Sequence, residues 1–323
     1  MLRASLPFFL FLGAAATAFG SVDAGLMGLV PSDTKVVFSI GVQDARDSEF
    51  GQFILRNLQV NDPHMQQFMT QTGFDPRRDL QAMVVALGST GGGASNNSSF
   101  AVLARGSFDM SKITALAQQH GSKVQRVADV DVYLPGDGKG PSQHAFAFLD
   151  PDVVGIGDLN SLRQMIANRE TPSQLDPNLQ SLVEKASAGQ EIWFASTGGV
   201  PHPTDMPQGG EGHQQQVMQA LQGIVRSCGG IKLGNVVQFS FDAITRSDKD
   251  AMSLGDVIRF LAAAAQMQRD QNAQQAQILG PALDNLNLST SGNEVHVTTA
   301  VPENLLERMG PVMGAISGQP HAR

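Results

Sequence analysis

Four side chains of the kinds that bind metal ions lie close together in this sequence. They are His202, Asp205, Glu211 and His213, in a stretch rich in proline and glycine. Imidazole and carboxylate groups are ligands for zinc and related divalent ions. The same residues are also ordinary members of a solvated loop. We expect a loop without a resident metal or cofactor, and these four residues are the candidate ligands if a metal does bind.

The chain has one cysteine, Cys228, between Ser227 and a pair of glycines. A catalytic thiol needs a histidine base, which only the fold could bring next to it. A buried cysteine otherwise behaves as a small apolar residue, and this is the interpretation we favour. A single cysteine also excludes an internal disulfide and a zinc site made of several cysteines.

Signature motifs of common enzyme classes are missing from the sequence. Neither the nucleophile elbow G-x-S-x-G, the zinc motif H-E-x-x-H nor the phosphate-binding G-x-x-x-x-G-K-[ST] occurs. Gly155-Ile156-Gly157 resembles a dinucleotide loop, but it lacks the third glycine, and the following Asp158 would repel a phosphate. We interpret it as a turn followed by a helix cap, and we assign no catalytic residue.

A cluster of charges precedes an apolar run that begins at Leu80. It consists of Asp75, Arg77, Arg78 and Asp79. Opposite charges at such short spacing are expected to pair with one another at the surface, where ion pairs contribute little stability. We interpret the cluster as locally paired and solvated, with a regulatory contact as the alternative.

Composition indicates a globular chain. The 323 residues are 41% hydrophobic and 16% charged, and the net charge is −8. A negative chain without a basic stripe is not expected to bind nucleic acid.

The N-terminus has the pattern of an export signal. Arg3 precedes a short apolar run, and small residues follow up to Gly20, with an A-x-A-like site at Ala16–Ala18. The run is shorter than the roughly 20 residues that a spanning helix needs, so we do not expect a membrane anchor or an integral membrane protein. We predict that residues 1–20 are a signal peptide and that the mature protein is soluble and lies in the periplasm or outside the cell.

Beyond the leader, short apolar runs alternate with helical patterns. Residues 99–168 predict a strand, a helix capped by Asp109, several strands joined by tight turns, and a helix capped by Asp158. A further helix is expected to turn Val217 and Ile224 inward. Strands joined by short turns favour antiparallel pairing. We therefore expect an α+β fold with mainly antiparallel sheets and the helices packed on one face.

The order of these predicted elements repeats along the chain. The matching segments are 35–40 with 191–196, 82–105 with 230–244, and 145–156 with 286–300. The copies share little identity, so the repeat depends on pattern alone. We expect two similar halves, 21–170 and 171–314, followed by a flexible tail at 315–323. The halves would either share one sheet or pack as separate lobes.

Several of these turns resemble those of a family of uncharacterised exported bacterial proteins of the acidobacterial and planctomycete type. The matching segments are Val30-Pro31-Ser32-Asp33, Gly73-Phe74-Asp75-Pro76 with Asp79-Leu80, Gly106-Ser107-Phe108-Asp109, and Gly155-Ile156-Gly157-Asp158. The resemblance covers most of the mature chain and implies a signal peptide and a duplicated α+β fold. It implies no catalytic residues.

These observations favour a non-catalytic binding or interaction module, whose partner is an unknown protein or a small apolar ligand. A broad apolar groove or an exposed sheet edge would support it. One alternative is a periplasmic hydrolase with a site assembled from scattered residues such as Cys228, which needs a deep polar pocket with two titratable groups. The other is a carrier of an apolar ligand, which needs a cavity lined by phenylalanine and methionine.

Overall fold

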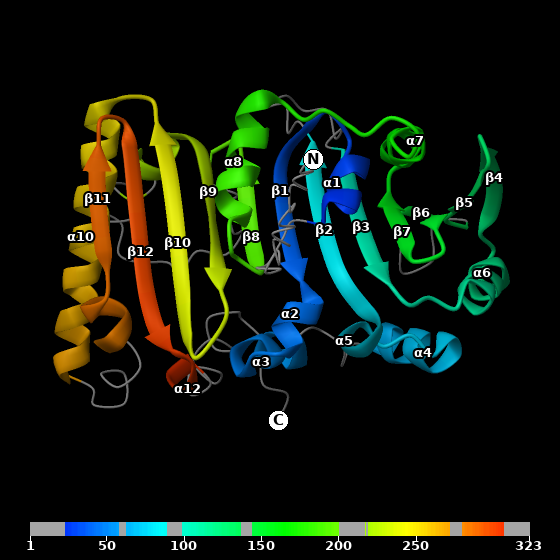
Figure 1. The fold of residues 1–323 in the computed structure, drawn as a ribbon, viewed down its shortest axis with the longest axis horizontal. Coiled ribbons are helices and arrows are strands. Elements are labelled where there is room, and N and C mark those ends of the chain that lie inside the picture. Colours follow the sequence, from blue (N-terminus) through cyan, green and yellow to red (C-terminus); the bar gives the residue numbers. More distant parts are fainter. Residues whose placement is uncertain are drawn as a thin grey trace, which may run out of the picture.

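One antiparallel sheet organises the chain in this computed structural model (Figure 1). The structure describes residues 23–57, 63–88, 99–136, 144–199, 217, 219–271 and 280–306. The strands are β1 (Thr34–Gly41), β2 (Leu80–Gly88), β3 (Phe100–Gly106), β4 (Lys123–Val127), β5 (Val130–Leu134), β6 (Ala145–Asp150), β7 (Val153–Gly157), β8 (Ile192–Ser196), β9 (Ile224–Lys232), β10 (Val236–Thr245), β11 (Asn287–Ser291) and β12 (Glu294–Pro302). The predicted α+β fold with antiparallel strands is confirmed.

The two predicted halves of the chain join in this single sheet. The strand order is β11-β12-β10-β9-β8-β1-β2-β3-β7-β6-β5-β4, so β1 and β8 meet in the middle. In that pair Val37 lies opposite Ala195 and Ser39 opposite Trp193. Outward from the pair, β1-β2-β3-β7-β6 and β8-β9-β10-β12-β11 follow the same order. Strand order alone does not test common origin, so the duplication stays a prediction.

One side of the sheet carries the main core, which we call the aliphatic face. Side chains alternate between the two sides of a strand, and Val37, Val84 and Leu103 all point to this side, where they are almost fully buried. Leu162 and Leu182 pack on them from two of the covering helices. The helices on this side are α1 (Ala24–Leu29), α7 (Leu159–Ala167) and α8 (Pro177–Ser187).

The opposite side, which we call the aromatic face, is also covered in part by helices. Ala45, Phe50, Ala251 and Leu306 pack against it from helices that lie along the length of the sheet. Those helices are α2 (Val42–Arg46), α3 (Glu49–Asn57), α10 (Asp248–Gln271) and α12 (Glu303–Leu306). Three more helices, α4 (Pro63–Thr72), α5 (Pro76–Asp79) and α6 (Met110–Gln119), lie along the lower edge of the half of the sheet that runs from β2 to β4, as Figure 1 shows.

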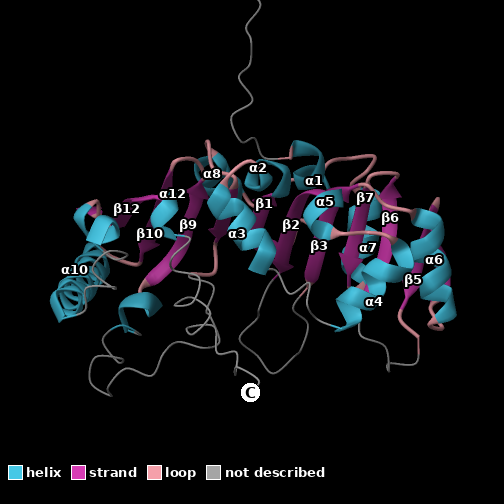
Figure 2. Ribbon diagram, turned by 90° about the horizontal axis from the view of Figure 1, so that it is seen from below, coloured by secondary structure: helices cyan, strands magenta, loops and turns pink. Residues whose placement is uncertain are grey.

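The helices thus differ from the expectation that they would pack on one face only. Figure 2 shows α1 and α8 on one side of the sheet and α10 and α4 on the other. The reason lies in the central strands, which are apolar at nearly every position. β2 reads LQAMVVALG, a pattern typical of a strand buried on both sides.

Local sequence signals explain where several elements begin. Asp109 accepts a hydrogen bond from the Lys112 backbone N–H at 3.1 Å, and Asp158 accepts bonds from the N–H groups of Asn160 and Ser161 at 3.0 Å. Both predicted helix caps are therefore confirmed.

The predicted helix that would turn Val217 and Ile224 inward is wrong at its end. The helical residues stop at Gln222, and Ile224 opens strand β9. Ile224 and Val225 form a short apolar run, which fits a buried strand as well as a buried helix segment. None of the described helices is long and apolar enough to cross a membrane. The leader and the tail at 315–323 lie outside the described residues.

Candidate functional site

The four candidate metal ligands, His202, Asp205, Glu211 and His213, lie outside the described residues. Among the residues that are described, no group of three or more histidine, cysteine, aspartate or glutamate side chains could hold a metal ion. The structure therefore adds nothing to the case for a metal in that loop.

Cys228 lies in β9 and is fully buried on the aliphatic face. Burial, together with the nearby Asp242 carboxylate, raises the pKa of its thiol to about 11. Asp242 lies directly opposite Cys228 in the neighbouring strand, and it binds His296 Nδ1 and Lys185 Nζ, each at 2.8 Å. The carboxylate therefore stands between the thiol's strand and the imidazole's strand. This order is the reverse of a catalytic arrangement, in which the imidazole contacts the thiol.

An open groove on the aromatic face is the most site-like feature of the described chain. Its volume is about 690 Å³. Three apolar side chains, Phe74, Phe108 and Met110, line it, and Met110 is 39% exposed while the two rings are half-buried. The remaining lining residues are Thr72, Gly73, Arg78, Asp79, Ser107, Asp109, Lys112 and Pro151. We call this feature the Phe108 groove.

The wall of the groove is a tight connection between α4 and β2. Gly73 ends α4 with φ +77°, a left-handed conformation that favours glycine. Asp75 then caps α5 by accepting a hydrogen bond from the Arg77 N–H at 3.0 Å, and Pro76 occupies the first helical position. The sequence signals predicted a polar connection here, and the structure adds that it forms one turn of helix.

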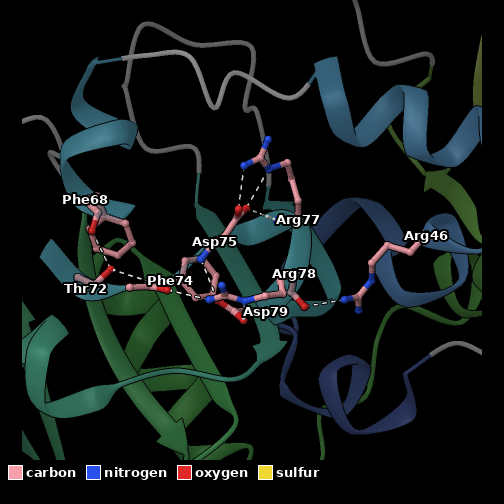
Figure 3. Close-up of polar contacts among 9 residues, drawn as sticks. Arg46, Phe68, Thr72, Phe74, Asp75, Arg77, Arg78 and Asp79 are labelled. Carbon is pink, nitrogen blue, oxygen red and sulfur yellow. Dashed lines mark hydrogen bonds and ion pairs between the residues drawn. The ribbon is translucent and has the colours of Figure 1, made fainter. Parts of the chain in front are cut away.

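Ion pairs tie this connection together, as Figure 3 shows. Arg77 binds Asp75 at 2.8 Å, and Arg78 binds Asp79 at 2.7 Å. Asp79 also accepts a hydrogen bond from the Asp75 N–H at 2.8 Å, and Arg46 donates to the Arg78 carbonyl oxygen. These contacts match the interpretation of the cluster as locally paired.

The pairing also changes the acidity of the carboxylates. The hydrogen bond from Arg77 lowers the pKa of Asp75, and the hydrogen bond from Arg78 lowers the pKa of Asp79. On the other side of the groove, the hydrogen bond from Lys112 lowers the pKa of Asp109. Each of these acids is therefore ionised at neutral pH and is unsuited to donate a proton.

A row of aromatic rings leads from the groove across the sheet. Phe74 stacks on Phe108 with centroids 5.2 Å apart, and Phe108 meets Phe148 at 6.0 Å. Phe148 contacts Phe146, which stacks on Tyr133 of β5 at 4.9 Å. Offset and edge-on arrangements of this kind are the favourable ones for aromatic pairs, so the rings at the floor of the groove support one another.

The charges around the groove are already balanced. Arg78 is paired with Asp79, and Lys112 is paired with Asp109 at 3.0 Å. A charged ligand would have to compete with these pairs, whereas an apolar ligand would only have to cover Phe74, Phe108 and Met110. The arrangement can therefore bind an apolar group, and it offers no activated nucleophile among the residues that line it.

Sequence reasoning found one wall of this groove but not its floor. The Asp75–Asp79 cluster stood out through its charges, while Phe108 entered only as part of the turn motif Gly106–Asp109 and Met110 was not singled out. The signal that points to them is the run Gly106-Ser107-Phe108-Asp109-Met110, in which two large apolar residues flank a cap that must lie at the surface.

Comparisons with known proteins leave the family open. No family model and no curated protein matches this sequence. A solved structure of TP0453, in its crystal form I, is similar over 92% of this chain and 98% of that chain, with 11% identity and a TM-score of 0.49. So distant a likeness carries no argument about activity or partners. The family expected from the turn motifs stays a prediction.

Proposed function

We propose that this chain is a non-catalytic binding module that receives an apolar segment of a partner in the Phe108 groove. The observation that carries the proposal is the exposure of Met110 beside Phe74 and Phe108, within an otherwise ion-paired rim. Apolar surface left open in this way is typical of interaction sites. Export to the periplasm or beyond remains part of the proposal, on the strength of the leader pattern alone.

A hydrolase with Cys228 as its nucleophile has less support. The thiol is buried, its pKa is raised to about 11, and the carboxylate of Asp242 is the group opposite it. A hydrolase that uses the loop at 202–213 would be recognised by its metal. Metal analysis of the chain purified from its own host tests this, since a stoichiometric ion lost in His213→Ala would contradict the proposal.

A carrier of a small apolar ligand is the closer competitor. It would normally enclose its cargo, but the Phe108 groove and a second groove of about 650 Å³ beside α10 are both open to solvent. An open groove fits a segment that extends beyond it, which favours a partner chain over an enclosed small molecule.

Binding of an uncharged apolar dye tests the groove itself. We expect Nile red to bind with a blue-shifted emission, and we expect Phe108→Ser and Met110→Ser to weaken binding at least tenfold. Met252→Ser is the matched control, because Met252 is a helical methionine that is even more exposed but lies on α10, outside the groove. Equal losses of Nile red affinity in Met110→Ser and Met252→Ser would contradict the proposed site.

A further inference from the structure

The two outer strands of the sheet differ in a way that points to self-association. β4 and β11 lie at the two ends of the strand order, and each pairs with one neighbour only among the described strands. An outer strand presents backbone N–H and C=O groups that can pair with another chain, and proteins commonly block this with charged residues. The two edges can therefore be compared by their side chains.

β4 carries such protection and β11 does not. The sequence of β4 is KVQRV, with Lys123 and Arg126 both exposed. The sequence of β11 is NLSTS, without a charge or a proline. The side chains of β11 itself would therefore bring no like charges together if a second copy paired with this strand.

The residues of β11 are also complementary to themselves. If two copies pair antiparallel about Ser289, Asn287 lies opposite Ser291 and Leu288 opposite Thr290. Asn287, Ser289 and Ser291 are exposed and share one side of the strand, where hydroxyl and amide groups can hydrogen-bond across the pair. The other side brings together Leu288 and the methyl group of Thr290, so each side of the strand meets a like surface.

Helix α10 backs this edge and adds apolar surface beside it. Gly255 of α10 approaches Thr290 so closely that a Cβ there would lie 3.2 Å from its hydroxyl oxygen. Met252 lies three residues before Gly255, and residues at that spacing share one side of a helix. Met252 is 57% exposed, so it offers apolar surface on the helix that packs behind β11.

From these observations we infer that the chain forms a two-fold dimer through β11, which joins two sheets edge to edge. Antiparallel pairing of identical strands about one point is an isologous contact, which closes on itself and does not continue into a filament. This inference is independent of the Phe108 groove, which lies at the ends of β2, β3 and β6, in the half of the sheet away from β11.

A charge placed at the centre of the edge tests the dimer. In sedimentation velocity at increasing concentration, we expect the unmodified chain to approach twice its monomer mass. Ser289→Lys sets two cations opposite each other and should weaken dimerisation at least tenfold. Gln125→Lys is the matched control, because Gln125 is the central residue of β4, and it should dimerise as the unmodified chain does.

A mixing experiment distinguishes charge repulsion from misfolding of Ser289→Lys, because only a folded variant can be rescued by a partner of opposite charge. An equimolar mixture of Ser289→Lys and Ser289→Glu should recover the dimer, because opposite charges then face each other. A chain that stays monomeric at every concentration overturns the inference. Assembly that Gln125→Lys abolishes also overturns it, since β4 would then be part of the contact.

Discussion

The two faces of the sheet are built from different side chains. The aliphatic face packs leucine, valine, alanine and methionine against α1, α7 and α8, and its core, as far as the chain is described, contains no phenylalanine. The aromatic face carries Phe38, Phe146, Phe148, Phe194 and Phe241 on its strands, and all five are half-buried. One face is closed and the other is partly open.

The difference fits the proposed function, in which the aliphatic face stabilises the fold and the aromatic face provides the surface that binds a partner. Branched aliphatic side chains fill a core at high density, and Trp193 and Cys228 are enclosed among them. Aromatic rings keep a rigid shape even when one side of the ring is exposed, which suits a surface that must be open and well defined. The Phe108 groove lies where this second kind of packing meets the surface.

Thiol reactivity should show the largest contrast between the faces. Cys228 on the aliphatic face is buried and its pKa is raised to about 11, so the reactive thiolate is scarce at pH 8. We expect Ellman's reagent to modify it at least a hundredfold more slowly than it modifies Met110→Cys, whose new thiol would lie in the open groove. Similar modification rates for Cys228 and for the new thiol of Met110→Cys, both measured in the folded protein, would contradict this contrast between the faces.

Neighbouring valines in β2 provide a matched stability test. Val84 points to the aliphatic face and is 1% exposed, whereas Val85 points to the aromatic face and is half-buried. We expect Val84→Ala to lower the free energy of unfolding by about 2 kcal/mol and Val85→Ala by less than about 1 kcal/mol. Urea unfolding of the two variants measures the difference. Equal losses would mean that the aromatic face is as closely packed as the other.

Removal of a carboxylate should loosen the groove wall. Asp79→Ala loses the ion pair with Arg78 and the hydrogen bond from the Asp75 N–H. We expect the free energy of unfolding, measured with urea, to fall by about 1–2 kcal/mol. Asp256→Ala is the control, because its ion pair with Arg259 is highly exposed and should contribute close to nothing.

The same carboxylate should respond to pH. The folded chain holds the pKa of Asp79 below its ordinary 3.8, so its contribution is complete above about pH 4 and is lost as the pH falls through the lower folded value. Asp79→Asn should therefore flatten that part of the acid unfolding profile. An unchanged profile in the variant would show that the ion pair does not stabilise the wall.

The smallest expected effect is a gain of stability at the hairpin between β4 and β5. Ala128 adopts φ +51°, a conformation that glycine accepts more readily than alanine. Ala128→Gly should raise the free energy of unfolding by up to about 1 kcal/mol. Ala117→Gly, inside α6, should lower it by a similar amount. Because this hairpin ends the sheet, the change should leave dye binding in the groove unaltered.

Short-range signals predicted much of this fold. The caps at Asp109 and Asp158 and the tight turns that join the strands between them all follow from a few neighbouring residues. The position of the helices on the sheet was harder to predict. A central strand such as β2 is apolar on both sides, and its sequence alone does not reveal that helices cover both faces. The predicted helix through Ile224 was wrong for a related reason, because a short apolar run fits a strand or a helix equally well.

The groove depends on contacts that no local pattern contains. Phe74 and Phe108 are 34 positions apart in the sequence, and they stack because β2 and β3 are paired. Without the strand order, the charges of Asp75–Asp79 were visible but the rings beside them were not.

Methyl NMR of the methionines can locate the binding surface. With labelled methionine methyl groups, we would titrate the chain with Nile red and follow Met110 in the groove, Met165 in the aliphatic core and Met252 on α10. We predict that the Met110 resonance shifts with the dye's binding curve while those of Met165 and Met252 stay in place. Saturable binding with Met110 unmoved would contradict the proposal that the Phe108 groove is the binding site.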